Sequence, residues 1–211
     1  MIIHLLGAPR AGKDTAAAIM RFAGFEPLSV SKLIRQEIEL EMTGATNYLA
    51  ECTDSLARGL LEYRLRTLKE GGISPLDEFP PPLLRETLQL WGTEFRRNQC
   101  GTDYWVDLLH ERVERTKDAA IVGTRFINEW DAFPGAGIFI TGREYVPDTP
   151  SHESERLTRN LLDIYGSPVF CGHPVKYVTN NNPKFFAENL RNALRNLSAL
   201  EGYEALRDRI A

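Results

Sequence analysis

The sequence has few cysteines and no long apolar run, and each shortage excludes a class of protein. Its three cysteines, Cys52, Cys100 and Cys171, are odd in number, far apart and outside any C-x-x-C pair, which argues against a disulfide framework and against a zinc site. The apolar segment at residues 2–6 is too short for a signal peptide or a membrane span. We therefore expect a protein of the reducing cytoplasm that has no membrane partner.

An excess of positive charge is also lacking. The chain has 29 acidic and 25 basic side chains, which give a net charge of −4. Polymeric nucleic acid and anionic membranes are therefore not expected partners, and a phosphate ligand has to be held by locally grouped arginines. The 211 residues, 43% of them hydrophobic and 26% charged, suffice for one ordinary globular core. We expect one domain, residues 1–211.

A glycine loop near the N-terminus is the most informative segment. It runs G-A-P-R-A-G-K-D-T from Gly7 to Thr15, between the apolar run at residues 2–6 and an alanine-rich segment that favours a helix. The spacing G-x-x-x-x-G-K is that of a phosphate-binding loop, in which backbone N–H groups and a helix N-terminus surround an anion while a lysine reaches the terminal phosphates. The alternative is a strand-to-helix turn that binds nothing.

The residue types in this loop suit phosphate chemistry. Gly7 and Gly12 permit backbone conformations and a close approach that side chains would block, and Lys13 adds a flexible point charge. Thr15 offers a hydroxyl one residue later than usual. Asp14 suits the helix dipole but would repel phosphate unless Mg²⁺ or a neighbouring arginine lies between them. The predicted nucleotide-binding residues are Gly7, Arg10, Ala11, Gly12, Lys13, Asp14 and Thr15, with Asp14 and Thr15 as candidate Mg²⁺ ligands.

Apolar runs alternate with helical patterns along the rest of the chain. The patterns predict strands at residues 25–30, 119–123, 138–141 and 175–179, and helices at 32–42, 47–69, 83–97, 107–115 and from 183 onward. Strands that alternate with helices, with a phosphate loop after the first strand, predict a parallel sheet covered on both faces. Core candidates in two of these helices are Leu49, Leu56, Leu60 and Leu61, and Phe186, Leu190, Leu194 and Leu197. We expect the charged C-terminal tail to be frayed or lightly packed.

The segment 83–97 predicts a helix with two different faces. At 100° per residue, its apolar side comprises Leu83, Leu84, Leu88, Leu90, Trp91 and Phe95. Its opposite, polar stripe comprises Arg85, Gln89, Thr93 and Arg96. Such stripes usually face solvent, but Tyr104 and Trp105 follow among polar groups and could line a base pocket. They could equally belong to the core.

Five segments, in order, resemble those of one enzyme family. The loop is similar to the G-A-P-G-A-G-K-G-T loop of adenylate kinases, and its G-K-D-T form resembles more closely the deoxynucleoside monophosphate kinases of tailed phages. L-S-V-S-K-L-I-R at residues 28–35 resembles the start of the acceptor lobe of nucleoside monophosphate kinases. L-Q-L-W-G-T-E-F-R-R at 88–97 with G-T-D-Y-W at 101–105 is similar to the phage-type pattern L-Q-x-x-G-T-E-x-x-R…G-x-D-x-W. R-F-I-N-E at 125–129 and S-H-E-S-E at 151–155 match that family's R-F-x-N-E and S-H-x-S-E.

The resemblance implies a fold and a reaction. The fold would be α/β of the P-loop nucleoside monophosphate kinase type: a three-layer α/β/α core with a mostly parallel sheet, a helical acceptor lobe at about 31–100 and a small lid at about 142–160. The reaction would move the γ-phosphoryl group of Mg²⁺-bound ATP to a deoxynucleoside 5′-monophosphate, in the host cytoplasm if the protein is phage-encoded. The implied catalytic residues are Lys13, Arg125, Arg143 and Arg156, and the implied substrate-binding residues are Arg35, Gln89, Thr93, Arg96, Arg97 and Trp105.

One departure from the family pattern keeps alternatives open. The family tends to carry an aspartate near the end of the third strand, where this chain has Gly123, so a carboxylate for Mg²⁺ is missing there. One alternative is a P-loop kinase for another acceptor, either a small molecule or a hydroxymethylated pyrimidine in DNA. The other is a nucleotide-binding regulator without catalysis. Assembly into a homodimer is also left open.

Overall fold

The computed structural model describes residues 1–8, 10–77, 81–142 and 167–209, which belong to two compact units. The sheet unit comprises Met1–Ser29 and Leu109–Ala211, and the helical unit comprises Val30–Leu108. The helical unit spans nearly the same residues as the acceptor lobe expected at about 31–100, and its role in acceptor binding stays a prediction. The predicted lid at about 142–160, with Arg143 and Arg156, lies outside the described residues except for Gly142.

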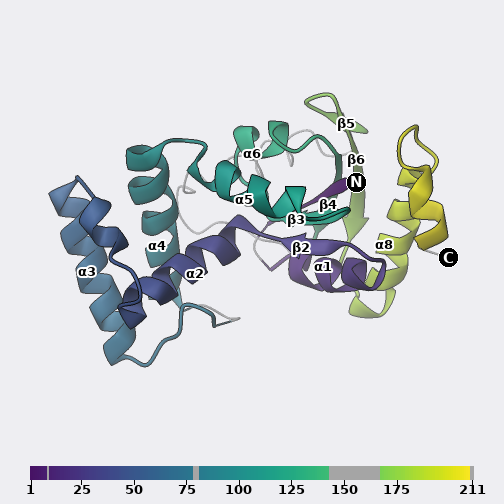
Figure 1. The fold of residues 1–211 in the computed structure, drawn as a ribbon. Helices are drawn as coiled ribbons and strands as arrows, with labels where there is room; N and C mark the ends of the chain where they lie inside the picture. Colours follow the sequence, from purple (N-terminus) through teal and green to yellow (C-terminus); the bar gives the residue numbers. More distant parts are fainter. Residues whose placement is uncertain (9, 78–80, 143–166, 210–211) are drawn as a thin grey trace. The chain divides into compact units, whose positions relative to one another are not determined.

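The sheet unit is built on a six-stranded sheet with the order β2-β3-β1-β4-β6-β5 (Figure 1). Its strands are β1 (Ile2–Leu6), β2 (Glu26–Leu28), β3 (Ala119–Val122), β4 (Ala136–Thr141), β5 (Val169–Phe170) and β6 (His173–Thr179). Neighbouring strands are parallel except for β5, which pairs antiparallel with β6. The central strands are almost fully buried, which explains their continuous apolar runs. The predicted α/β class with a mostly parallel sheet is confirmed.

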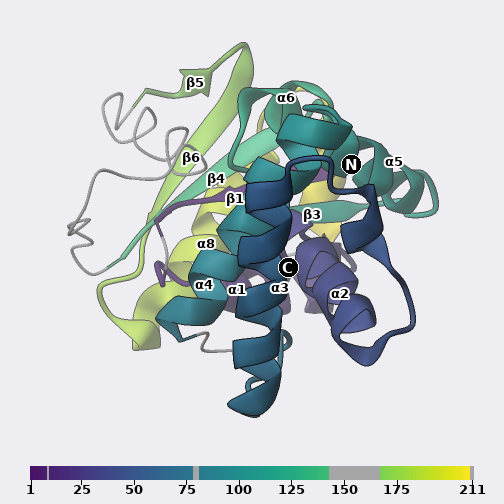
Figure 2. The ribbon, with the colours of Figure 1, turned by 90° about the vertical axis from the view of Figure 1, so that its left-hand side faces the viewer.

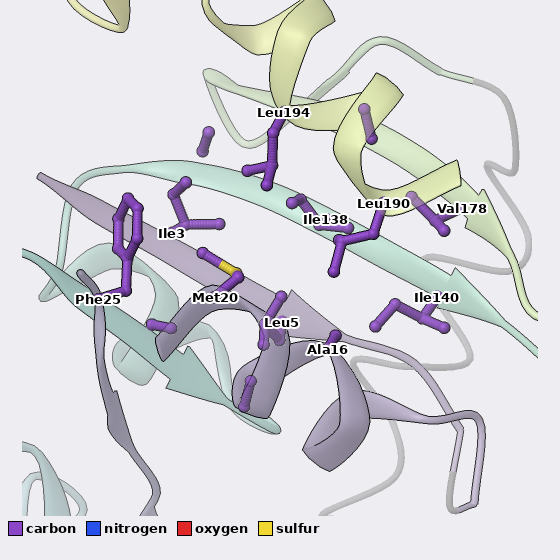
Figure 3. Packing of buried hydrophobic residues seen from close by; sticks show 14 of the residues in the cluster. Ile3, Leu5, Ala16, Met20, Phe25, Ile138, Ile140, Val178, Leu190 and Leu194 are labelled. Atoms are coloured by element: carbon purple, nitrogen blue, oxygen red, sulfur yellow. The ribbon is translucent and has the colours of Figure 1, made fainter. Parts of the chain in front are cut away.

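Helices cover both faces of this sheet (Figure 2). One face packs against α1 (Lys13–Phe22) and α8 (Pro183–Leu197), and Figure 3 shows Met20 of α1 and Leu190 of α8 meeting Ile3 and Ile138 of the strands. The other face packs against α6 (Ile127–Asp131) through Trp130. The predicted inward residues of α8 are confirmed, because all four are at most 2% exposed: Phe186, Leu190, Leu194 and Leu197.

The C-terminal segment is more firmly held than predicted. It forms a 3₁₀-helix, η4 (Glu204–Arg209), and its Leu206 is fully buried in the sheet unit's core. Arg209 also forms an ion pair of 2.8 Å with the buried carboxylate of Asp118. The expectation of a frayed tail was wrong for these residues, because one leucine and one ion pair anchor an otherwise charged segment.

The helical unit contains α2 (Val30–Thr43), the 3₁₀-helix η1 (Tyr48–Glu51), α3 (Ser55–Glu70), α4 (Pro82–Gln89), the π-helix η2 (Leu90–Cys100) and the start of α5 (Tyr104–Glu114). The predicted helix at 47–69 is thus two helices. The Asp54 side chain caps α3 by accepting bonds from the N–H groups of Leu56 and Ala57. From that start, α3 buries Leu61 but leaves Leu56 81% and Leu60 40% exposed, so two of the four predicted core leucines were wrong.

The predicted α-helix at 83–97 changes its winding halfway. It is α-helical as far as Gln89 and then continues as η2, with i→i+5 geometry. Trp91 and Arg96, five residues apart, would point about 140° apart in an α-helix, and the wider turns of η2 let both reach Glu37 of α2. As a result Thr93 and Arg96, predicted on the polar stripe, are only 6% and 1% exposed.

Candidate phosphate-binding site

The glycine loop connects β1 to α1 at the carboxyl ends of the parallel strands, in the sheet unit. The residues that follow β3 and β4 are both glycines, and both lie against the loop. A Cβ atom on Gly142 would come within 2.9 Å of Ala11 Cα, and one on Gly123 would lie 3.6 Å from Lys13 Cε. Open α/β sheets bind their ligands at this edge. The loop therefore lies where the sequence predicted a phosphate site.

Two glycines give the loop its shape. Gly7 has φ +136°, and a Cβ there would lie 2.3 Å from the carbonyl oxygen of Ile140. Gly12 has φ +105°, and a Cβ there would lie 2.3 Å from Asn180 Nδ2. That same amide donates a 2.8 Å hydrogen bond to the carbonyl of Ala11. The glycines are thus needed for packing of the loop against its own unit, in addition to the predicted approach of a phosphate.

Lys13 is held close to the loop that it follows. Its Nζ donates hydrogen bonds to the carbonyl oxygens of Gly7, at 2.8 Å, and Ala8, at 2.7 Å. It is also the first residue of α1, whose N-terminus has no side-chain cap among the described residues. The ammonium group and the first N–H groups of a helix therefore gather positive charge at one end of the loop.

Asp14 and Thr15 are exposed in the first turn of α1, where metal-bound phosphates could reach them. Among the described residues, no group of three or more His, Cys, Asp or Glu side chains could hold a metal ion. Mg²⁺ commonly binds through one or two carboxylates, substrate phosphates and several waters. Asp14 and Thr15 therefore fit a Mg²⁺ that arrives bound to the phosphates of its nucleotide.

The turn after β3 is held by His4, a residue for which the sequence analysis predicted no role. His4 is fully buried in β1, and its Nε2 donates to the Phe133 carbonyl at 2.7 Å, so its Nδ1 accepts from the Thr124 hydroxyl at 2.9 Å. Burial lowers the pKa of His4 to about 4, which keeps the ring neutral near pH 7. Next to Thr124, the Arg125 N–H donates to Glu129 Oε2 at 2.8 Å. The two residues that follow Gly123, Thr124 and Arg125, are thus each held by a hydrogen bond to a side chain.

A second group of predicted residues lies inside the helical unit. The buried carboxylate of Glu37 accepts hydrogen bonds from Trp91 Nε1 at 2.8 Å, from Arg96 Nε at 2.8 Å and from the Tyr104 hydroxyl. We call Glu37, Trp91, Arg96 and Tyr104 the Glu37 cluster. Burial and the bonded carboxylate raise the pKa of Tyr104, so it remains a neutral donor. The cluster ties α2, η2 and α5 together within this unit.

Arg96 is enclosed by this cluster and its neighbours. Its Nη1 forms a second ion pair, of 2.6 Å, with Glu51, and its guanidinium lies 4.6 Å from the Tyr48 ring centroid and 4.5 Å from that of Phe95. Burial would lower the pKa of Arg96, but its hydrogen bonds to Glu51 and Glu37 raise it. Two carboxylates therefore compensate the charge that was predicted to hold an acceptor phosphate.

The other predicted substrate residues differ in their surroundings. Trp105 is 1% exposed and donates from Nε1 to the Gly92 carbonyl at 2.8 Å, so of its two predicted roles the structure supports the core. Arg35 donates from Nη1 to the Pro75 carbonyl at 2.5 Å and holds the segment after α3. Gln89 is half-buried at the end of α4, and Arg97 is buried in η2. The loop residues predicted to bind ATP therefore lie in the sheet unit, and the residues predicted to bind the acceptor lie in the helical unit.

Comparisons with known proteins do not assign a family. No protein-family model and no curated protein matches the sequence. Among solved structures, the chain is similar to the crystal structure of TT1252 from Thermus thermophilus, at 16% identity and a TM-score of 0.44, over 94% of this chain and 96% of that one. Within the part of the chain that the structure describes, no helix is long and apolar enough to cross a membrane.

Proposed function

We propose that the protein is an ATP-dependent kinase that phosphorylates a deoxynucleoside 5′-monophosphate, giving a deoxynucleoside diphosphate and ADP. The observation that carries this proposal is the loop from Gly7 to Thr15. Its glycines have positive φ angles, and its lysine donates hydrogen bonds to two loop carbonyls. The loop also lies at the carboxyl edge of a parallel sheet. These features suit the triphosphate of a nucleotide.

On the donor side, the loop N–H groups and Lys13 would bind the β- and γ-phosphates of ATP. Thr15 and Asp14, both exposed beside them, are the protein groups that would face a bound Mg²⁺. Mg²⁺ supplies neutralisation of the charge on the β- and γ-phosphates. Gly123 offers no carboxylate, so nucleotide phosphates and water would fill most of the metal's coordination shell.

On the acceptor side, the helical unit carries the candidate residues. The resemblance implies Arg96 and Arg97 as substrate-binding residues, and one of the two would hold the acceptor phosphate; Arg96 is also paired with Glu37 and Glu51. Arg35 would assist in holding that phosphate, and the amide of Gln89 would bind a base edge. The acceptor is already an anion, so catalysis needs positioning and charge neutralisation and no strong general base. Arg125, together with Arg143 and Arg156 outside the described residues, would close over the transferred group.

The test is an assay of ADP formation from Mg·ATP with each of the four common deoxynucleoside monophosphates, with ribonucleoside monophosphates alongside. We expect ADP to appear only when an accepted monophosphate is present, and the deoxynucleoside diphosphate to form in equal amount. ADP formed with none of them, while ATP still binds, would contradict the proposal. That result would support the nucleotide-binding regulator, which the absent carboxylate at Gly123 already favours as second candidate.

A further inference from the structure

Arg10, in the middle of the phosphate loop, has a backbone conformation that L-residues rarely adopt. Its φ is +64°, and Cys171 is the only other described non-glycine residue with a positive φ. A glycine would adopt this conformation without steric penalty, whereas any side chain makes it unfavourable. Strained residues of this kind persist mainly at functional sites. Arg10 therefore lowers the stability of the loop, and we expect its side chain to form a contact that compensates for this loss.

Contacts among the described residues do not provide that compensation. The Arg10 side chain is exposed, and it forms no hydrogen bond, ion pair or ring contact with the described residues. Three other arginines show what such contacts look like: Arg35 binds backbone carbonyls, Arg96 two carboxylates and Arg209 the carboxylate of Asp118. The compensating contact of Arg10 is therefore expected with a ligand of the loop.

The loop's other cation is restrained. Lys13 Nζ is bonded to two loop carbonyls, and the neighbouring position at the end of β3 is an uncharged glycine, Gly123. In phosphoryl transfer, negative charge develops on the three equatorial oxygens of the moving group, and the planar fork of a guanidinium matches such oxygens. Arg10 is the exposed guanidinium that the loop itself carries.

We infer that Arg10 is a catalytic residue whose guanidinium binds the γ-phosphoryl oxygens in the transition state. The inference rests on the proposed phosphoryl transfer. An oxygen of the acceptor phosphate forms a bond to the γ-phosphorus while the bond from that phosphorus to the β,γ-bridging oxygen breaks, and the electron pair leaves with ADP. Arg10 gains and loses no proton in this step. Arg10 thus lowers the stability of the loop and places a positive charge beside the reacting group.

The substitution Arg10→Gly separates strain from function, because it should change stability and activity in opposite directions. We expect the Tm to rise by about 2 °C while kcat falls about 100-fold or more, with little change in KM for ATP. Arg10→Lys keeps the charge without the fork and should have an intermediate kcat. The matched control is Cys171→Gly, which relaxes φ +47° in the turn between β5 and β6 and should raise Tm without changing kcat.

The outcomes distinguish this inference from the proposed function. A kcat of Arg10→Gly within threefold of the unmodified protein, or a rise in KM for ATP with kcat unchanged, would overturn the catalytic role of Arg10 and leave the kinase assignment intact. If no monophosphate is phosphorylated but ATP is hydrolysed to ADP in a reaction that Arg10→Gly suppresses, the acceptor assignment fails and the role of Arg10 holds. A protein that neither transfers nor hydrolyses the γ-phosphoryl group overturns both.

Discussion

The phosphate loop and the Glu37 cluster use arginine and lysine in opposite ways. The loop leaves Arg10 exposed, and Lys13 donates hydrogen bonds to two of its backbone carbonyls. In the Glu37 cluster the charge of Arg96 is enclosed by two carboxylates and three aromatic rings. Both segments include residues of the motifs from which a kinase was predicted, and the pairing of Arg96 suits the second segment to holding its unit together.

The comparison predicts first that Lys13→Ala removes activity without unfolding the protein. Loss of the ammonium should lower kcat about 10³-fold or more, because preorganised charge at the transferred group is lost. Steady-state kinetics with an accepted monophosphate measure the effect, and a thermal melt checks the fold. The control is Lys184→Ala, which removes an exposed lysine from the first turn of α8. Equal rates for both variants would remove the loop from the mechanism.

The second prediction is the reverse: Arg96→Met should act on stability. It leaves the buried carboxylate of Glu37 without its cation, which costs about 3–5 kcal/mol. Urea unfolding followed by tryptophan fluorescence can measure this cost, since Trp91 lies in the same cluster. The double variant Glu37→Gln with Arg96→Met should be less destabilised than Arg96→Met alone, because no buried charge remains unpaired.

Arg64→Met is the matched control for this second prediction. Its ion pair of 2.8 Å with Glu86 belongs to the same unit, but that carboxylate is 57% exposed. Exposed ion pairs contribute about 0–1 kcal/mol, so this variant should unfold close to the unmodified protein. Equal losses for Arg64→Met and Arg96→Met would show that burial does not distinguish the two arginines.

What the sequence could predict follows from the range of the interactions involved. The parallel strands and α8 were predicted because each depends on a local apolar pattern, and the loop because its spacing is local too. The two-residue strand β5 has no such pattern. In α3, leucines occur on two sides of the helix, and burial against the rest of the unit selected the side of Leu61 over that of Leu56.

The site residues that sequence reasoning misplaced depend on distant partners. Arg96 faces Glu37, 59 positions away, and the bend into π geometry that brings it there has no signal in a pattern counted at 100° per residue. His4 depends on Thr124, 120 positions away. A buried histidine in an apolar strand was the available signal, since such a ring needs two hydrogen-bond partners.

The third prediction concerns this histidine and the pH dependence of stability. The pKa of His4 is lowered by burial from 6.5 to about 4, so the unfolded chain binds its proton first as the pH falls. The stability that the neutral His4 ring gives the folded protein is therefore complete above pH 6.5. It is lost progressively as the pH falls toward 4, by about 3 kcal/mol in total. Urea unfolding at pH 7.5, 6 and 5 measures it.

Two variants identify the histidine responsible. His4→Asn should flatten the dependence of unfolding free energy on pH between 7.5 and 5, although it lowers stability throughout. His110→Gln, at an exposed position of α5, is the control variant. If the slope persisted in His4→Asn, the neutral ring between Thr124 and Phe133 would not be its source.

The smallest predicted effect compares the stability lost through close packing at a loop glycine with the stability lost through its backbone conformation alone. Gly12→Ala meets both a positive φ and the Asn180 amide, whereas Gly24→Ala meets a positive φ of +84° with nothing within 4 Å of the added Cβ. The conformational penalty alone is about 1–2 kcal/mol, so Gly24→Ala should lose about that much and Gly12→Ala more. Unfolding free energies in urea give the difference. If the two losses were equal, the loop would have room to move away from Asn180, and its close packing would not be what fixes its conformation.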